Sequence, residues 1–146
     1  MSVLWSTDAM SDAMQAERAG NLPAGISGIS IDSRTLSKGD AFFAIQGDNR
    51  DGHDFVDAAL KAGAALAVVA KGQRRRFADA PLLIVDDALE GLRALARAAR
   101  ERLHGKVIAV TGSVGKTTTK EALRLALSAD GETHASAASY NNHWGV

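Results

Sequence analysis

Two hydrophobic periods alternate along the first hundred residues, and this alternation predicts an α/β fold. Apolar residues at helical spacing predict helices at about 7–18, 54–62 and 87–103. Each of these helices starts at a side chain that can cap its first turn, namely Thr7, Asp54, and Asp86 or Asp87.

Short apolar runs bounded by turn residues predict the strands of this fold. They occupy residues 28–32, 41–45, 64–70 and 82–85. The last two runs are continuously apolar, which is typical of strands buried on both faces of a sheet. Residues 1–104 are therefore predicted to form one compact domain, and residues 105–146 to begin a second.

A phosphate-binding turn is predicted at the start of the second domain. The apolar run at 107–110 is typical of a buried strand, and a helix is expected from 117 to about 128. Gly112 and Gly115 allow the backbone to turn so that its N–H groups converge on an anion at the helix N-terminus. Lys116 adds a positive charge for the terminal phosphates, and the Thr117 hydroxyl is a ligand for Mg²⁺.

The general phosphate-loop pattern is incomplete, because it has a glycine where this chain has Val110. The alternative is a simple glycine turn with a solvated Lys116. Gly-Lys-Thr-Thr at a strand-to-helix junction favours the phosphate site. Only one strand and one helix of a nucleotide-binding domain follow residue 105, so we expect the front of a longer protein, with an acidic Mg²⁺ ligand further along.

Composition excludes several other classes of protein. Seventeen Lys and Arg residues balance 17 Asp and Glu, so no overall basic field indicates a nucleic-acid partner. The absence of cysteine excludes disulfides and thiolate metal sites, and the four histidines lack metal-ligand spacing. Without a signal peptide or a membrane-spanning apolar run, the sequence predicts a soluble, cytoplasmic protein that does not insert into membranes. A monomer is expected, although no sequence feature identifies the oligomeric state. The basic run Arg74-Arg75-Arg76 is interpreted as a solvated loop.

Four stretches of the chain, taken in order, share their residues with one family. The first combines Ile-Asp-Ser-Arg at 31–34 with Lys-Gly-Asp-Ala-Phe-Phe-Ala at 38–44. The second is Gly-Asp-Asn-Arg-Asp-Gly-His-Asp-Phe-Val at 47–56, and the third is the phosphate loop with its Lys-Glu at 120–121. The fourth is Asn-Asn-His-Trp-Gly-Val at 141–146. Across nearly its whole length the chain thus resembles the Mur ligases of bacterial peptidoglycan synthesis.

The resemblance implies an N-terminal UDP-binding domain, built on a mixed sheet with helices, followed by the first βα unit of a P-loop ATPase domain. It implies a ligase that uses ATP and Mg²⁺ to join D-alanyl-D-alanine to UDP-N-acetylmuramoyl-tripeptide through an acyl phosphate. The present chain, as a fragment, is expected to be inactive alone. The alternatives are a sister ligase that adds the third amino acid (diaminopimelate or lysine), a non-catalytic nucleotide-binding module, and an unrelated P-loop NTPase.

The resemblance also assigns residues to roles. Lys116 is the expected catalytic residue, and Thr117 is the expected metal ligand. Two departures from the family pattern are Val114 and Ser139, where a polar residue and an asparagine are usual. His53 is expected to cap or brace a helix entry rather than act as a base. Contacts to ATP are expected from Thr111, Gly112, Ser113, Val114, Gly115, Lys116, Thr117 and Thr118, and contacts to the UDP-peptide from Ser33, Arg34, Asn49, Asn141 and Asn142.

Overall fold

The structure, a computed structural model, describes residues 3–136. The chain divides into two compact units, residues 1–103 and residues 104–146. Each unit is described by itself below.

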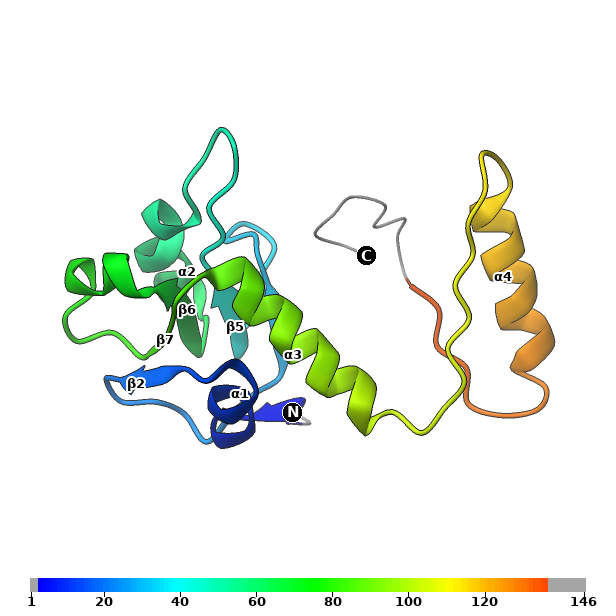
Figure 1. The fold of residues 1–146 in the computed structure, drawn as a ribbon, viewed down its shortest axis with the longest axis horizontal. Coiled ribbons are helices and arrows are strands. Elements are labelled where there is room, and N and C mark those ends of the chain that lie inside the picture. The colour runs from blue at the N-terminus through cyan, green and yellow to red at the C-terminus, as the bar shows by residue number, and fades with distance from the viewer. Residues whose placement is uncertain (1–2, 137–146) are drawn as a thin grey trace. The chain divides into compact units, whose positions relative to one another are not determined.

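A five-stranded mixed sheet forms the centre of the first unit (Figure 1). Four neighbouring strands, β4 to β7, run parallel to one another, and β2 pairs antiparallel with β7 at one edge. The mixed sheet expected from the sequence is therefore confirmed. In spatial order the strands are β2 (Glu17–Ala19), β7 (Leu82–Val85), β6 (Leu66–Ala70), β5 (Asp40–Phe43) and β4 (Gly28–Ser30).

Helices cover both faces of this sheet. Helices α1 (Thr7–Met14) and α3 (Ala88–Arg102) pack against each other, and α3 also contacts β5 and β6 (Figure 1). Helix α2 (Val56–Ala62) contacts β6 and shares a core with the opposite face of the sheet. The remaining elements of the unit are short: the 3-10 helices η1 (Gly52–Phe55) and η2 (Lys71–Arg76), and the strand pair β1 (Trp5–Ser6) and β3 (Gly25–Ile26).

The two faces of the sheet are buried by alternate residues of each strand. Phe42, Ala67 and Leu82 are register partners across β5, β6 and β7, and they belong to the core that includes α2. Their sequence neighbours Phe43 and Val68 are also fully buried, and alternation directs them to the opposite face. Continuous apolar strands follow from this arrangement, because a sheet covered on both faces has no solvated side.

The first helix is shorter than the sequence suggests. The predicted span of 7–18 and the Thr7 cap are wrong: Ser6 is the N-cap and accepts the N–H of Ala9 at 3.2 Å. The helix ends at Met14 because Gln15 adopts a left-handed conformation with φ of 50°. The chain then turns into β2 and pairs with β7, which is a tertiary contact that local helix propensity does not include.

Two further helix starts test the predicted caps. Asp87 caps α3 by accepting the N–H of Glu90 at 2.8 Å, which confirms one of the two candidates. Asp54 is not a cap; Asp51 fills this role for η1, accepting the N–H of His53 at 2.9 Å. Gly63 ends α2 with φ of 110°, a conformation that glycine adopts without steric cost.

The ends of the first unit meet. The guanidinium of Arg102, the last residue of α3, lies 3.4 Å from the centre of the Trp5 ring in β1. The Trp5 side chain is buried, whereas Arg102 is exposed, so the guanidinium covers the ring from the solvent side.

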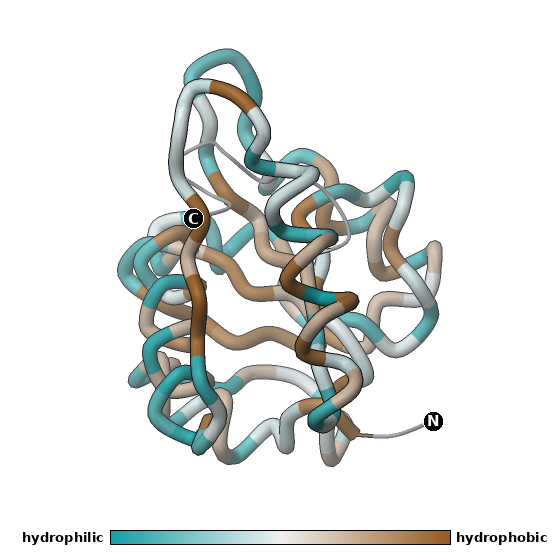
Figure 2. Tube along the Cα trace, turned by 90° about the vertical axis from the view of Figure 1, so that its right-hand side faces the viewer, coloured by the Kyte–Doolittle hydropathy of each residue, from teal (hydrophilic) through white to brown (hydrophobic). Residues whose placement is uncertain are grey.

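The second unit contains the predicted helix but not the predicted strand. Helix α4 (Lys116–Leu127) follows the glycine loop. Residues 107–110 form no strand, although Figure 2 shows the hydrophobic stretch that suggested one. A strand requires a hydrogen-bonded neighbour, and within residues 3–136 none lies beside this segment, so Val107 and Ile108 remain more than half exposed. The expected βα unit is therefore corrected to a glycine loop and a helix.

Candidate functional site

Three of the five predicted UDP-substrate residues lie at the carboxyl edge of the parallel strands. Because β4 and β5 are adjacent and parallel, the segments that follow them leave the sheet at the same edge. Ser33 and Arg34 belong to the turn after β4, and Asn49 belongs to the loop after β5. Open α/β sheets bind ligands in the crevice outside this edge. The fold therefore brings together two segments that are separate in the sequence.

Arg34 is held by its neighbour Asp32. The Arg34 Nε and Nη2 atoms donate to the two oxygens of Asp32 at 2.9 and 2.6 Å, and the Arg34 backbone N–H also donates to this carboxylate at 2.9 Å. The Arg34 side-chain hydrogen bond, followed by the backbone one, lowers the pKa of Asp32 to about 2. The pair is exposed on the Arg34 side, where 78% of the side chain is accessible. A guanidinium fixed in this way can present its remaining N–H groups to a phosphate or carboxylate.

The loop that carries Asn49, residues 46–51, is closed by backbone contacts between its two ends, which form its neck. The N–H of Gly47 donates to the Arg50 carbonyl at 2.9 Å, and Gln46 forms an isolated bridge with Asp51. The N–H of Gly52 donates to the Ile45 carbonyl at 2.9 Å, which ties the residue after the loop to the residue before it. Asn49 is exposed on this loop, and its amide is thus available to a ligand.

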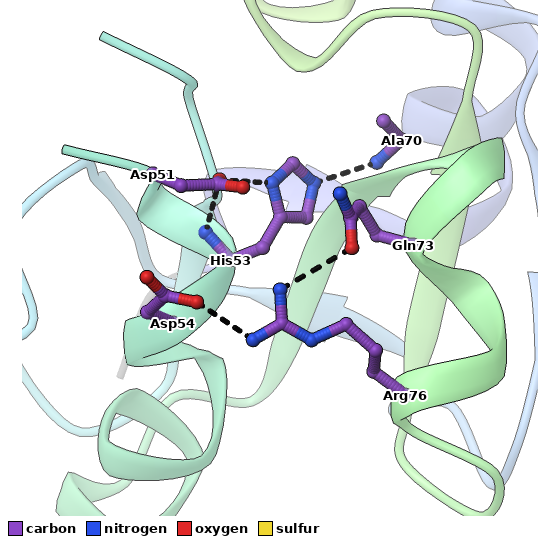
Figure 3. A network of polar contacts seen from close by, with 6 residues as sticks. All are labelled: Asp51, His53, Asp54, Ala70, Gln73 and Arg76. Atoms are coloured by element: carbon purple, nitrogen blue, oxygen red, sulfur yellow. Dashed lines mark hydrogen bonds and ion pairs between the residues drawn. The ribbon is translucent and has the colours of Figure 1, made fainter.

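A polar network beneath the loop connects η1 to β6 and η2 (Figure 3). His53 is only 2% exposed, and its ring lies between Asp51, at 2.5 Å from Nδ1, and the backbone N–H of Ala70, at 3.0 Å from Nε2. Burial raises the pKa of Asp51, but hydrogen bonds from the backbone and ring of His53 outweigh it, so this pKa is lowered overall. The prediction that His53 braces a helix entry is confirmed by these contacts.

An exposed ion pair lies beside this network. Arg76 of η2 donates to Asp54 of η1 at 2.7 Å and to Gln73 at 3.2 Å. The interpretation of Arg74-Arg75-Arg76 as a solvated loop is half right: all three residues are exposed, but they belong to η2, and Arg76 has an acidic partner.

The predicted phosphate loop is present as a turn into α4. Gly115 is the N-cap, with φ of 78°, and Gly112 has φ of 148°; both are values that favour glycine. Lys116 is the first residue of the helix, and its Nζ donates to the Gly112 carbonyl at 2.7 Å. Helix N-termini attract anions through their unpaired N–H groups and dipole. In this structure Lys116 closes the loop on itself, and it must turn outward to meet a phosphate.

A concave surface of about 750 Å³ lies next to this loop within the second unit. Cationic side chains of α4, namely Lys116, Lys120 and Arg124, line part of it. Ile108 and Val110 of the extended segment line another part, together with Leu123 of α4. The surface therefore combines cationic and apolar side chains near the glycine turn, and Asp130 and Glu132 also line it.

Thr117 is the one predicted metal ligand. No cluster of three histidine or acidic side chains able to hold a metal occurs within residues 3–136. Mg²⁺ in nucleotide sites takes few protein ligands and keeps phosphate oxygens and waters, so one hydroxyl at a helix start fits a metal that arrives with its nucleotide. Asn141, Asn142 and Ser139 lie outside the described residues. None of the helices in the described part of the chain is long and apolar enough to span a membrane.

Asp32 and Asp51 are the site residues that sequence reasoning missed. The sequence predicts Asp32 as the last residue of a strand and assigns no role to Asp51. Both lie in stretches shared with the Mur ligases, and each stands two residues before its partner, Arg34 or His53. Such spacing also occurs in turns without any side-chain contact.

A mixed sheet with helices on both faces, followed by a glycine turn into a further helix, places this chain among the α/β proteins. Comparison with known families is more specific. The description "Mur ligase family, catalytic domain" matches residues 25–100, and "Mur ligase middle domain" matches residues 110–146. The chain belongs to the Mur ligase family.

Individual relatives agree with this assignment. The UDP-N-acetylmuramoyl-tripeptide--D-alanyl-D-alanine ligase of Rickettsia prowazekii is 36% identical over 144 residues, which are 99% of this chain and 31% of that protein. Ligases named for adding 2,6-diaminopimelate also match, at 37 to 39% identity over 68 to 80% of the chain. The chain spans less than a third of the length of these curated relatives.

Solved structures agree as well. Crystal structure II of MurF from Acinetobacter baumannii has a TM-score of 0.81 and 35% identity, over 97% of this chain and 31% of that one. MurF from Thermotoga maritima, in complex with ADP, has a TM-score of 0.55 and 36% identity, over 69% of this chain and 23% of that one.

Proposed function

We propose that this chain supplies the UDP-substrate edge and the ATP phosphate loop of a ligase that adds D-alanyl-D-alanine to UDP-N-acetylmuramoyl-tripeptide. The match that covers 99% of the chain, to a relative named for this activity, is the observation that carries the proposal. In this assignment residues 1–104 bind the UDP-peptide and residues 105–146 contribute to ATP binding.

The chemistry of the proposed reaction has two steps. A carboxylate oxygen of the tripeptide attacks the γ-phosphorus of ATP, and the bond to the β-phosphate oxygen breaks with release of ADP. The amine of D-alanyl-D-alanine then attacks the acyl carbon, loses a proton, and displaces inorganic phosphate. Both steps depend on positioning and charge neutralisation.

Residues of the second unit have their role in the first step. Gly112 and Gly115 shape the turn, and Lys116 neutralises charge on the transferring phosphoryl group. Thr111, Ser113, Val114 and Thr118 complete the loop around the phosphates. Thr117 would hold Mg²⁺, which supplies charge neutralisation when it is bound.

Residues of the first unit hold the substrate. Ser33 and Asn49 offer a hydroxyl and an amide at one edge of the sheet, and Arg34 offers a guanidinium already oriented by Asp32. Asn141 and Asn142 remain proposed substrate ligands on sequence resemblance. Ligation by the 146 residues alone is not expected. They span less than a third of the length of the relatives, and none of them has a proposed contact with the acceptor dipeptide.

Isothermal titration of the 146-residue chain tests the assignment of the two units. UDP-N-acetylmuramoyl-tripeptide and ATP with Mg²⁺ are titrated separately against the wild type, Ser33→Ala/Arg34→Ala, and Lys116→Ala. We expect the double variant to lose affinity for the UDP-peptide alone and Lys116→Ala to lose affinity for ATP alone. Arg93→Ala, on the exposed side of α3, is the control and should bind both.

The same titration separates the alternatives. Tighter binding of the UDP-dipeptide than of the UDP-tripeptide would favour the sister ligase that adds the third residue, whose relatives also match. If the chain binds ATP but binds neither UDP-peptide, an unrelated NTPase is favoured. Loss of both ligands in a single variant that stays folded would contradict the division of roles.

A further inference from the structure

The buried ring of His53 accepts a backbone hydrogen bond from β6 that no strand is present to accept. The carbonyl of Val68 in β6 accepts the N–H of Ala44 at 3.0 Å, so Val68 faces the β5 side. Backbone groups two residues apart along a strand point the same way, and Ala70 therefore also faces that side. β5 has ended at Phe43, so at Ala70 no strand remains to accept the N–H. His53 Nε2 accepts it instead, at 3.0 Å.

This contact fixes the protonation of the ring. A backbone N–H can only donate, so Nε2 of His53 is unprotonated and Nδ1 carries the proton. Nδ1 then donates to the Asp51 carboxylate, 2.5 Å away (Figure 3). The neutral ring with its proton on Nδ1 satisfies both neighbours at once. It links the last residue of the Asn49 loop to the last residue of β6.

Asp51 connects the His53 ring to the loop of residues 46–51. Its carboxylate also accepts the His53 backbone N–H at 2.9 Å, and its backbone forms the bridge with Gln46 that closes the loop. Within the described residues, the loop is otherwise tied to the sheet by the Gly52 N–H at the neck. The position of the exposed Asn49 relative to the edge of β4 and β5 thus depends on the Asp51–His53–Ala70 chain.

We propose that His53 is a positioning residue for UDP-substrate binding, acting through Asp51 to hold the loop of residues 46–51, and with it Asn49, against the carboxyl edge of the sheet. This inference rests on the proposed function, because it takes the UDP-peptide as the ligand of that edge. It assigns His53 no contact with substrate and no proton transfer.

A second connection provides the control. Arg76 joins η2 to Asp54 of η1 by an exposed ion pair, next to the His53 network but outside the loop (Figure 3). Exposed pairs of this kind contribute little to stability. Arg76→Ala should therefore leave the Kd for the UDP-peptide unchanged.

The test compares His53→Asn, Asn49→Ala and the double variant in the 146-residue chain, with UDP-N-acetylmuramoyl-tripeptide as the probe. Asn can still donate to Asp51 from near the position of Nδ1, but it is too short to accept from Ala70. We expect the Kd to rise about tenfold in His53→Asn, roughly the effect of one lost hydrogen bond. In the Asn49→Ala background, the His53 substitution should have no further effect, because it acts through Asn49.

Hydrogen exchange and a second variant guard against a folding defect. The Ala70 amide should exchange slowly in the wild type and fast in His53→Asn. His53→Gln places a carbonyl near the position of Nε2, so the Ala70 amide should stay protected while the Asp51 contact is lost. His53→Gln should be more stable than His53→Asn. It should still show the raised Kd, because the hydrogen-bonded connection from the loop to β6 is then broken at Asp51.

Two outcomes would overturn the inference alone. One is an unchanged Kd in folded His53→Asn and His53→Gln while the wild type binds normally, and the other is fully additive losses in the double variant. A purely structural His53 would lower the free energy of unfolding and give these results. Absence of UDP-peptide binding by the wild type would instead overturn the proposed function, and this inference with it.

Discussion

Replacing Gly52 by alanine should loosen the neck of the Asn49 loop. A Cβ on Gly52 would lie 2.6 Å from the Ile45 carbonyl oxygen, 2.7 Å from the Ile45 nitrogen and 2.8 Å from the Ala44 carbonyl carbon. All three are backbone atoms of the two residues that follow β5, so no flexible side chain can move aside. The loop must shift, and the 2.9 Å hydrogen bond from Gly52 to Ile45 is lost or lengthened.

The expected cost follows from these two effects. Overpacking against fixed atoms costs about 1–3 kcal/mol, and a lost backbone hydrogen bond costs about 1 kcal/mol. Gly52→Ala should therefore lower the free energy of unfolding by roughly 2–4 kcal/mol. Because the loop moves with its neck, the Kd for the UDP-peptide should also rise.

Gly72→Ala is the matched control. A Cβ on Gly72 meets no atom within 4 Å, and the residue lies in the exposed η2. Its free energy of unfolding should be unchanged or raised by up to about 1 kcal/mol, since alanine restricts the unfolded chain. Urea unfolding monitored by far-UV circular dichroism measures both variants. Equal midpoints for Gly52→Ala and Gly72→Ala would refute the close-approach reasoning.

Three further outcomes are expected. In a complete ligase containing this chain, Lys116→Ala should abolish ATP-dependent ligation without changing the unfolding midpoint; near-normal turnover would remove the phosphate-loop assignment. By NMR, the pKa of the Asp32 carboxyl should be about 2, and it should be higher in Arg34→Gln, which loses the guanidinium but keeps the backbone hydrogen bond. Because the folded-state pKa is depressed, the stabilisation by this pair is present above pH 3.8 and is lost as the pH falls towards 2. Amides should exchange slowly through the strands and α3 of the first unit and fast at 104–115, and slow exchange through 104–115 would contradict this.

Sequence patterns predicted the elements whose burial dominates their conformation. The strand at 82–85 and the helix that Asp87 caps agree with the structure almost to the residue. Their patterns are unambiguous because one is buried on both faces of the sheet and the other has a single apolar stripe. Local signals and tertiary packing favour the same conformation in both.

Elements that depend on distant partners were predicted less well. Glu17 and Arg18 favour a helix locally, yet they form an edge strand because β7 offers hydrogen bonds there. Residues 107–110 show the opposite case, an apolar run without a neighbouring strand among the described residues. At the site, the spacing of Asp51 and His53 could not show that the ring reaches Ala70, because that contact exists only where β5 ends beside a longer β6.

The contact between Arg102 and Trp5 has a consequence for folding during synthesis. Glu17 of β2 pairs with Ile84 of β7, 67 residues later in the chain, and Trp5 of β1 contacts Arg102 of α3, 97 residues later. At about 5–20 residues per second, the first helix and its apolar face wait several seconds before they can be covered. The first unit therefore completes its fold only when its last helix has emerged, and a ribosome that pauses before residue 102 leaves Met10 and Met14 exposed to chaperones and proteases.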